Sequence, residues 1–245
     1  MRNKLLGLAA TLILLAGALA LFEFTNLDIW LQDHCYDFEK HRWRLEKQDA
    51  VPRVLFYTGP KVVMAVTGGI LIAWLLLPVR WRPKGLQKFQ LPWSHLRLWF
   101  VLICLAAVPA TIGFMKARSD LYCPWSIDRY GGDRPHLRFF EALPPDYPPD
   151  CGKCFPAGHA SGGFALLGLY YLSESRRGRW LGLTIGMTAG WVMGIYQMFK
   201  GAHFLSHTVV TMLIAAAIIQ AIAWLMKIHP DKASAANTKL PRIRK

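Results

Sequence analysis

The sequence predicts an all-α protein, specifically a six-transmembrane-helix bundle. Of its 245 residues, 53% are hydrophobic. Several apolar runs approach the roughly 20 residues that a helix needs to cross a bilayer. Basic residues are concentrated in alternate segments between these runs, as expected when one set of loops faces the cytoplasm. Because lipid offers no partner to free backbone groups, the runs are expected to be helical.

The six predicted spans follow one another along most of the chain. They are residues 5–22, 59–78, 96–115, 159–172, 180–199 and 208–228. The first run could instead be a signal peptide, because Ala18-Leu19-Ala20 resembles a cleavage site, although the run is long for one. The fourth run is short and would need residues from its flanks. Residues 1–228 are predicted to form one membrane-embedded domain and residues 229–245 a disordered basic cytoplasmic tail.

The charge distribution predicts which helix ends face the cytoplasm. The formal net charge of +14 does not indicate nucleic-acid binding, because the excess lies on one side of the predicted topology. Segment 79–97 contains five basic residues and no acid, and segment 173–179 contains three arginines and one glutamate. Both termini are therefore predicted to be cytoplasmic.

Three polar features then fall together on the outer face. Lys116 follows the third run, "CFPAGHASGGF" beginning at Cys154 opens the fourth, and "KGAHFLSHT" beginning at Lys200 joins the fifth to the sixth. These segments are far apart in the sequence but share one level of the membrane. The sequence therefore predicts an outward-facing candidate active site.

The segment "FPAGHASGGF" is typical of a helix start that can bind an anion. Pro156 and Gly158 favour a turn into a helix whose first amides lack internal partners and point outward. His159 lies at this terminus, and the small residues 160–163 would let a neighbouring helix approach closely. The alternative is a helix start with a packing face and no chemistry.

His203 and His207 are four residues apart and would share one face of a helix. They could be interfacial histidines that reach water, or a zinc-binding pair. No third ligand with convincing spacing follows them, so neither a metal nor another cofactor is predicted. Lys116 alone would be an ordinary interfacial anchor.

Together these residues resemble the phosphatidic acid phosphatase type 2 superfamily of membrane lipid phosphate phosphatases. Its first motif is a lysine, six residues and Arg-Pro, and here Lys116 precedes Cys123-Pro124 at that spacing. Its second motif, Pro-Ser-Gly-His, is similar to the sequence at 156–159. Its third motif has Ser-Arg, five residues, His, three residues and Asp, and His203 matches its histidine. The resemblance covers most of the chain.

The following positions depart from these motifs. Cys123 replaces the arginine of the first motif and Ala157 the serine of the second. Gln197 replaces the arginine of the third motif, and His207 replaces its aspartate. The sequence Cys-Pro-Trp and a histidine at the last position are similar to a bacterial branch of the superfamily. The resemblance thus implies a multi-pass protein of the bacterial cytoplasmic (inner) membrane, with its active site on the periplasmic or extracellular side.

The resemblance also implies a phosphohistidine mechanism. His203 would attack phosphorus, and His159 would protonate the leaving oxygen and later activate water. His207 would orient His203, unless a loop acid such as Asp128 or Asp133 does so. The residues expected to bind phosphate are Lys116, Ala157, Gly158, Gln197 and Lys200.

Lys200 is the expected substitute for the missing arginine, because it lies about one helical turn after Gln197. Lysine supplies a point charge without the two-pronged grip of arginine. The other candidates for this substitute are Arg118, Arg129 and Arg134.

The expected activity is hydrolysis of lipid phosphate monoesters or diphosphates. The expected partners are a membrane lipid phosphate and the lipid bilayer, with neither nucleic acid nor a protein partner. Undecaprenyl diphosphate, lipid A phosphates, phosphatidylglycerol phosphate and phosphatidic acid remain open as substrates. The alternatives are a phosphotransferase between membrane lipids and a catalytically inactive relative that binds lipid headgroups.

The cysteines predict a disulfide on the outer side. Cys104 lies within a predicted span, whereas Cys35, Cys123, Cys151 and Cys154 lie outside, where disulfides persist. Four cysteines allow three connectivities, and the sequence does not choose among them. A structural bridge that holds the loop beside His159 is favoured over a redox-active pair at 151–154.

Overall fold

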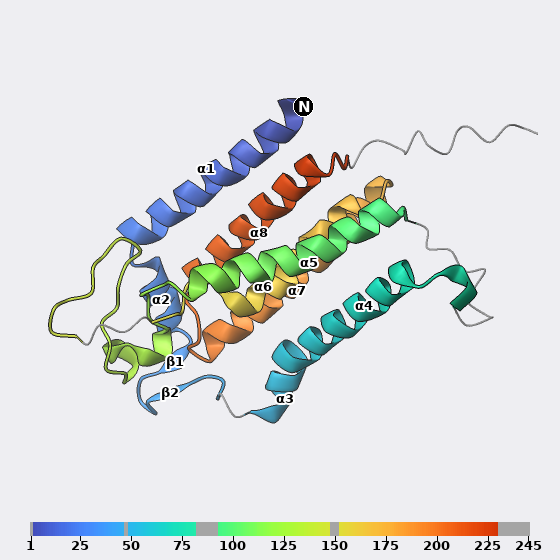
Figure 1. Cartoon of the computed structure of the whole chain (residues 1–245). Coiled ribbons are helices and arrows are strands. Elements are labelled where there is room, and N and C mark those ends of the chain that lie inside the picture. Colours follow the sequence, from blue (N-terminus) through green and yellow to red (C-terminus); the bar gives the residue numbers. More distant parts are fainter. Residues whose placement is uncertain (1, 47–48, 82–92, 148–151, 230–245) are drawn as a thin grey trace, which may run out of the picture.

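The computed structural model describes residues 2–46, 49–81, 93–147 and 152–229 (Figure 1). Within them the chain is mostly helical, which confirms the predicted class, apart from one small β-hairpin. The predicted tail at 229–245 lies outside the described residues, except for His229.

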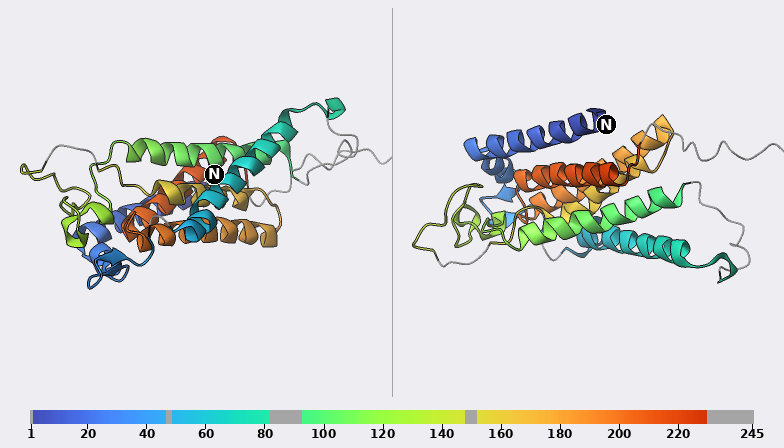
Figure 2. Two further views of the ribbon diagram at one scale, coloured as in Figure 1. Left: turned by 90° about the horizontal axis from the view of Figure 1, so that it is seen from below. Right: turned by 45° about the horizontal axis from the view of Figure 1, so that its top comes forward.

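Each predicted span overlaps one long helical element. These elements are α1 (Arg2–Phe24), α4 (Gly59–Leu76), α5 (His95–Lys116), α6 (Gly158–Ala165) continued by the 3₁₀ helix η6 (Leu166–Tyr171), α7 (Arg176–Phe199) and α8 (Leu205–Leu225). They run side by side, with α1 and α4 on opposite sides of the bundle (Figure 2). The start of α1 and the end of α8 lie at the same end of the bundle (Figure 1).

Among the described residues, four helices are long and apolar enough to cross a membrane, namely Leu5–Phe24, Ala50–Leu76, His95–Lys116 and Leu205–Leu225. The other two elements fall short in different ways. Helix α7 has 24 residues, but its glycines and polar ends make it less apolar. Helix α6 has only eight residues, and the tighter η6 extends it, so that the pair reaches roughly 24 Å at the rises typical of the two helix types. The count of six spans therefore stays a prediction.

The short elements gather at the end of the bundle opposite the start of α1 and the end of α8 (Figure 2). They are α2 (Leu27–Asp33), strands β1 (Tyr36–Asp37) and β2 (Arg42–Trp43), α3 (Ala50–Arg53), the π-helix η1 (Val54–Thr58), and the 3₁₀ turns η4 (Pro124–Ser126) and η5 (Asp128–Tyr130). A further 3₁₀ turn, η2 (Val79–Trp81), follows α4. The two strands pair antiparallel, with Tyr36 opposite Trp43. Apart from η2, which lies at the other end of α4, these segments form the cap over the candidate site.

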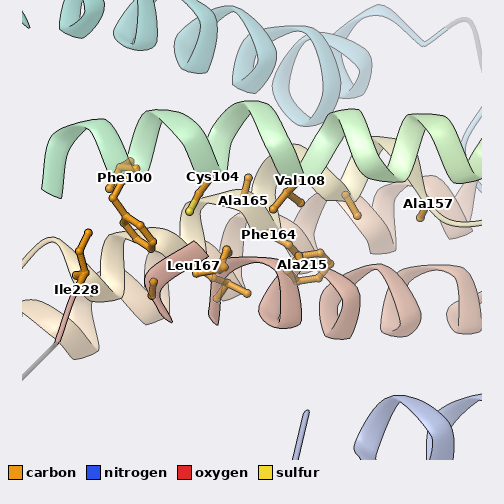
Figure 3. Packing of buried hydrophobic residues seen from close by; sticks show 13 residues of the cluster. Phe100, Cys104, Val108, Ala157, Phe164, Ala165, Leu167, Ala215 and Ile228 are labelled. Carbon is orange, nitrogen blue, oxygen red and sulfur yellow. The ribbon is translucent and has the colours of Figure 1, made fainter. Parts of the chain in front are cut away.

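The core lies between α5, α6 with η6, and α8. Phe100, Cys104 and Val108 of α5 point into one cluster with Phe164 of α6 and Ala215 of α8 (Figure 3). All five side chains are fully buried. Burying such apolar side chains against one another holds α6 firmly, although it is short.

A row of glycines on α7 brings that helix unusually close to α6 and η6. A Cβ added at Gly182, Gly186 or Gly190 would lie within 2.6 Å of an atom of the neighbouring element. On the α6 side, a Cβ at Gly163 would lie 2.5 Å from the backbone nitrogen of Gly190. This confirms that a neighbouring helix approaches the small residues after His159, a packing mode typical of membrane helices.

Candidate active site

The residues singled out in the sequence meet at the capped end of the bundle. Lys116 is the last residue of α5, and Gly158 is the first of α6, followed by His159. Lys200 immediately follows α7. His203 immediately precedes the segment that opens α8, and His207 lies in the first turn of that helix. Helix ends therefore supply every one of these side chains.

Two connections between helices, the one from α5 to α6 and the one from α7 to α8, are tied together around these helix ends. A disulfide joins Cys123 to Cys154, which selects one of the pairings left open by the sequence. Cys35 is a buried free thiol, and Cys151 lies outside the described residues. The Trp125 amide donates to the Gly201 carbonyl over 2.9 Å, and the Cys154 amide donates to that of Leu121 over 3.1 Å. Cys123 stands where the first motif has arginine, so at this position the protein has a covalent link beside the site.

The three histidines form a continuous row. Nδ1 of His159 lies 3.5 Å from Nε2 of His203, and Nδ1 of His203 lies 3.3 Å from Nδ1 of His207. His203 and His207 are buried, and His159 is half-buried. Each ring nitrogen of the central histidine thus faces a different imidazole. Such a row can hold one nitrogen protonated while the other is free to act as a nucleophile.

The surroundings of His203 favour its neutral form. The side chain is 1% exposed. Burial, and then the nearby His207, Lys116 and His159, hold the pKa of His203 well below its usual value. A neutral imidazole carries a free lone pair at neutral pH, which is the form required of a nitrogen nucleophile.

The same site raises the zinc alternative, because donor atoms of Cys154, His203 and His207 lie within 4.8 Å of one another. However, Sγ of Cys154 is bonded to Cys123. A disulfide sulfur is not a thiolate and does not supply a zinc ligand. The oxidised protein therefore offers only the two imidazoles of this cluster to a metal.

Three lysines lie near His159, and one of them was missed by the sequence analysis. Lys116, Lys61 and Lys200 all lie close enough to act electrostatically on His159. A Cβ added at Gly158 would lie 3.9 Å from Nζ of Lys116. Lys61 comes from α4. Ionisable residues within membrane spans are rare and usually functional, so a lysine inside this apolar run was the feature of the sequence that could have indicated a role for Lys61. The site therefore has more positive charge than its motifs indicate.

Tyr57 was also missed, and it links Lys61 to the histidines. Its ring lies 4.8 Å from that of His159, centroid to centroid. Nζ of Lys61 donates to the hydroxyl oxygen of Tyr57 over 3.0 Å. Nothing in the sequence joins Tyr57 to His159, because the contact depends on how η1 and α4 pack beside α6.

The amide of Ala157, a residue expected to bind phosphate, has a hydrogen-bond partner within the protein. This residue is fully buried, and its amide donates to Oγ1 of Thr211 over 2.8 Å. That hydroxyl in turn donates to the carbonyl of His207 over 2.7 Å. The Ala157 amide is therefore already satisfied and holds α6 against α8, so it is not available to a phosphate. Gly158, at the first position of α6, keeps an amide without a helical partner.

Gln197 is buried, and its side-chain nitrogen and oxygen have no hydrogen-bond partner among the described residues. Its backbone carbonyl accepts from the amide of Ala202 over 2.8 Å, which closes the turn before His203. Unpaired buried amide groups are costly, so a ligand or water that reaches Gln197 would be bound favourably.

The loop arginines considered as substitutes are engaged elsewhere. Arg129 forms two hydrogen bonds with the carboxylate of Asp33, at 2.8 and 2.7 Å. The guanidinium of Arg118 lies 3.6 Å from the ring centroid of Phe114. Arg134 pairs with Asp133, which is 84% exposed. Lys200 is the remaining candidate of this group beside His159.

The loop acids considered as orienting groups are also placed elsewhere. Asp128 accepts a hydrogen bond from the amide of Arg129, and Asp133 is largely in solvent. His207 lies in direct reach of Nδ1 of His203 at 3.3 Å, and Sγ of Cys154 lies 3.6 Å from the same nitrogen.

An apolar groove leads away from the histidines between α4 and α5. Its upper part has a volume of about 560 Å³ and is lined by Lys61, Gly158 and His159 among others. A second hollow of about 520 Å³ continues along the same helices towards Trp74 and Trp93. Met64, Gly68 and Leu105 line both, so the two hollows are adjacent. The groove exists because α4 contributes no buried residue and stands away from the bundle.

Comparison with protein families agrees with this arrangement. The family model described as "PAP2 superfamily" matches residues 97–230. The matched region begins in α5, ends just after α8, and contains all three of the motif segments discussed above. No curated protein and no solved structure matches the chain. Because the family model covers more than half of the sequence, the chain belongs to the PAP2 superfamily.

Proposed function

We propose that the protein is an outward-facing integral membrane phosphatase that hydrolyses lipid phosphate monoesters or diphosphates through a phosphohistidine intermediate. The observation that carries this proposal is the row of His159, His203 and His207, with Nε2 of His203 on the side of His159. Members of the PAP2 superfamily are generally phosphatases, which supports the reaction class.

The first step transfers the phosphoryl group to the protein. Nε2 of His203 attacks phosphorus, and the bond between phosphorus and the leaving oxygen breaks. The electron pair of that bond goes to the leaving oxygen, which takes a proton from His159. Nδ1 of His203 keeps its proton throughout. This N–H donates a hydrogen bond to Nδ1 of His207, which lies 3.3 Å away. His207 therefore carries its own proton on Nε2.

The second step returns the enzyme to its starting state. His159 takes a proton from a water molecule, whose oxygen attacks phosphorus. The phosphorus–nitrogen bond breaks, its electron pair returns to Nε2 of His203, and inorganic phosphate leaves. In both steps Lys116, Lys200 and the Gly158 amide would stabilise the charge that accumulates on the phosphoryl oxygens.

The apolar groove favours a lipid over a soluble ester. From Lys61 to Trp74 the groove follows 13 residues of helix, which is roughly 20 Å at the usual rise per residue. An acyl or isoprenyl chain could lie there while its headgroup reaches His159. The four apolar helices are consistent with a substrate that stays in the membrane.

Phosphate release from a panel of lipid phosphates by the purified protein tests this function. We expect release by the wild type and its loss in His203→Ala at equal concentrations of folded protein. Transfer of phosphate to a second lipid without release to water would instead identify a phosphotransferase. An inactive wild type that still binds the lipids would identify a headgroup-binding relative.

A further inference from the structure

Tyr57 and Lys61 form a cationic pair beside the catalytic histidines that none of the three motifs contains. The hydroxyl oxygen of Tyr57 accepts a hydrogen bond of 3.0 Å from Nζ of Lys61. The same ring packs against His159 at 4.8 Å between centroids. Lys200 approaches that ring as well, with Nζ 6.0 Å from its centroid. Tyr57 therefore lies between two lysines and the predicted acid–base histidine.

Local backbone structure favours this placement. Residues 54–58 form a turn of π-helix that runs into α4 at Gly59. A Cβ at Gly59 would lie 2.6 Å from the carbonyl oxygen of Val54, so the turn requires glycine there. Tyr57 and Lys61 are four residues apart and share one helix face. Single π turns of this kind are found frequently at functional sites.

The pair lies on the side of His159 from which the lipid would enter. Lys61, Gly158 and His159 line the mouth of the apolar groove, whereas His203 does not. His159 contacts His203 through Nδ1 and Tyr57 through its ring. A phosphoryl group held at His203 would therefore have its leaving group near Tyr57 and Lys61, with the lipid tail in the groove.

A cation at this position distinguishes two kinds of leaving group. When a lipid monophosphate is cleaved, the leaving group is an alcohol, which the proton from His159 neutralises. When a lipid diphosphate is cleaved, the leaving group is a lipid monophosphate, which still carries negative charge after it accepts that proton. Only the second leaving group gains from a fixed cation beside it.

We propose that Tyr57 and Lys61 form a second anion-binding subsite for the lipid-linked phosphate of a diphosphate substrate. This inference rests on the proposed function. Lys116 and Lys200 act on the phosphoryl group that is transferred, and Lys61 acts on the phosphate that leaves. Tyr57 is a positioning residue that holds Lys61 beside His159. The reaction consumes a lipid diphosphate and releases the lipid monophosphate and inorganic phosphate.

The test uses a lipid monophosphate and a lipid diphosphate with the same tail, and measures kcat/KM for both with full-length protein. Lys61→Met removes the charge and keeps an apolar side chain of similar length. Lys40→Met is the matched control, because Lys40 is an exposed lysine whose ammonium group pairs with Asp37 at 3.8 Å. Tyr57→Phe keeps the ring against His159 and removes the oxygen that accepts from Lys61.

The wild type should prefer the diphosphate. Lys61→Met should lower kcat/KM for the diphosphate by roughly 10- to 100-fold, near the lower range for losing one charge-stabilising group. Its kcat/KM for the monophosphate should fall by less than its kcat/KM for the diphosphate, and the activity that remains also shows that the variant is folded. Tyr57→Phe should shift the ratio in the same direction by less, and Lys40→Met should leave both rates unchanged.

Equal losses on both substrates in Lys61→Met, or a wild-type preference for the monophosphate, would overturn the subsite. If the wild type turns over neither lipid, the proposed function fails and the subsite fails with it. If the wild type hydrolyses both lipids but Lys61→Met leaves the ratio of their kcat/KM values unchanged, the proposed phosphatase function stands and only the subsite is refuted.

Discussion

Nδ1 of His203 lies 3.3 Å from Nδ1 of His207, so an imidazole occupies the position from which an aspartate orients the nucleophile in the third superfamily motif. A neutral imidazole accepts one hydrogen bond and fixes the tautomer of its neighbour. It does not stabilise a developing cation as a carboxylate does. Before the reaction His203 is neutral, because Lys116 lies near enough to disfavour its charged form. A neutral imidazole at position 207 is therefore sufficient to orient it in that state.

Replacement of His207 tests that orienting contact. His207→Ala should lower the rate of phosphate release by roughly 100-fold or more, as expected when a reacting group is mispositioned. His207→Asp should recover part of this loss, because it restores a charged acceptor with a shorter side chain. Steady-state rates of the three proteins on one lipid provide the measurement. Full activity in His207→Ala would show that this residue is a bystander.

Zinc should inhibit the protein only after the disulfide is opened. In Cys123→Ser the thiol of Cys154 is free, and it can join His203 and His207 as a third ligand. We expect added zinc to inhibit this variant at a concentration that leaves the wild type active. The double variant Cys123→Ser/Cys154→Ser is the control and should resist zinc. A chelator should leave wild-type activity intact, and a loss that zinc restores would revive the metal alternative.

The glycine row on α7 should be intolerant of even one methyl group. A Cβ at Gly186 would lie 2.5 Å from the backbone nitrogen of Leu167, so Gly186→Ala forces α7 away from η6. We expect a loss of about 1–3 kcal/mol in the free energy of unfolding, the usual range for overpacking. Gly17→Ala is the matched control, because nothing lies within 4 Å of its added Cβ. Denaturation in detergent that ranks the two variants equally would contradict this packing.

Asp28 should make stability depend on pH in a defined window. Its Oδ1 accepts a hydrogen bond of 2.8 Å from the amide of Ser206 in the first turn of α8. Burial raises the pKa of Asp28 from 3.8 to about 6, against the opposing effect of its bonds to Ser206. The folded state therefore binds this proton more tightly than the unfolded state. Stability from this group is fully present below pH 3.8 and is lost as the pH rises through 6.

Asp28→Asn keeps the acceptor oxygen and removes the ionisation. Relative to this variant, the wild type should therefore lose stability between about pH 4 and pH 6.5, the window set by the two pKa values. Melting temperatures of both proteins across that range measure the effect. Parallel pH profiles would show that Asp28 ionises normally in the folded protein.

Hydropathy and charge were sufficient to predict that Lys116, His159 and His203 lie at one level. Each residue stands at the end of an apolar run, and basic loops indicate which ends face together. The ends of helices can be predicted from local sequence, so the positions of these three residues could be predicted without knowing how the helices pack. The six overlapping helical elements follow from the same patterns.

Features that depend on packing were beyond these patterns. Tyr57 and Lys61 precede the first motif by more than 50 residues, and their contact with His159 depends on a π turn and on the position of α4. The Ala157 amide was expected to face a phosphate, but Thr211 of α8 takes its hydrogen bond. Cysteine spacing allowed three pairings, and only the fold brings Cys123 to Cys154.

The most direct measurement is the location of the phosphoryl group during turnover. The protein is mixed with its lipid substrate, quenched in alkali to preserve phosphohistidine, digested and analysed by mass spectrometry. The account predicts one phosphoryl group on Nε2 of His203, absent from His203→Ala and accumulating in His159→Ala if water attack becomes slow. Release of phosphate at the wild-type rate with no modified His203, or with the phosphoryl group on another residue, would contradict it.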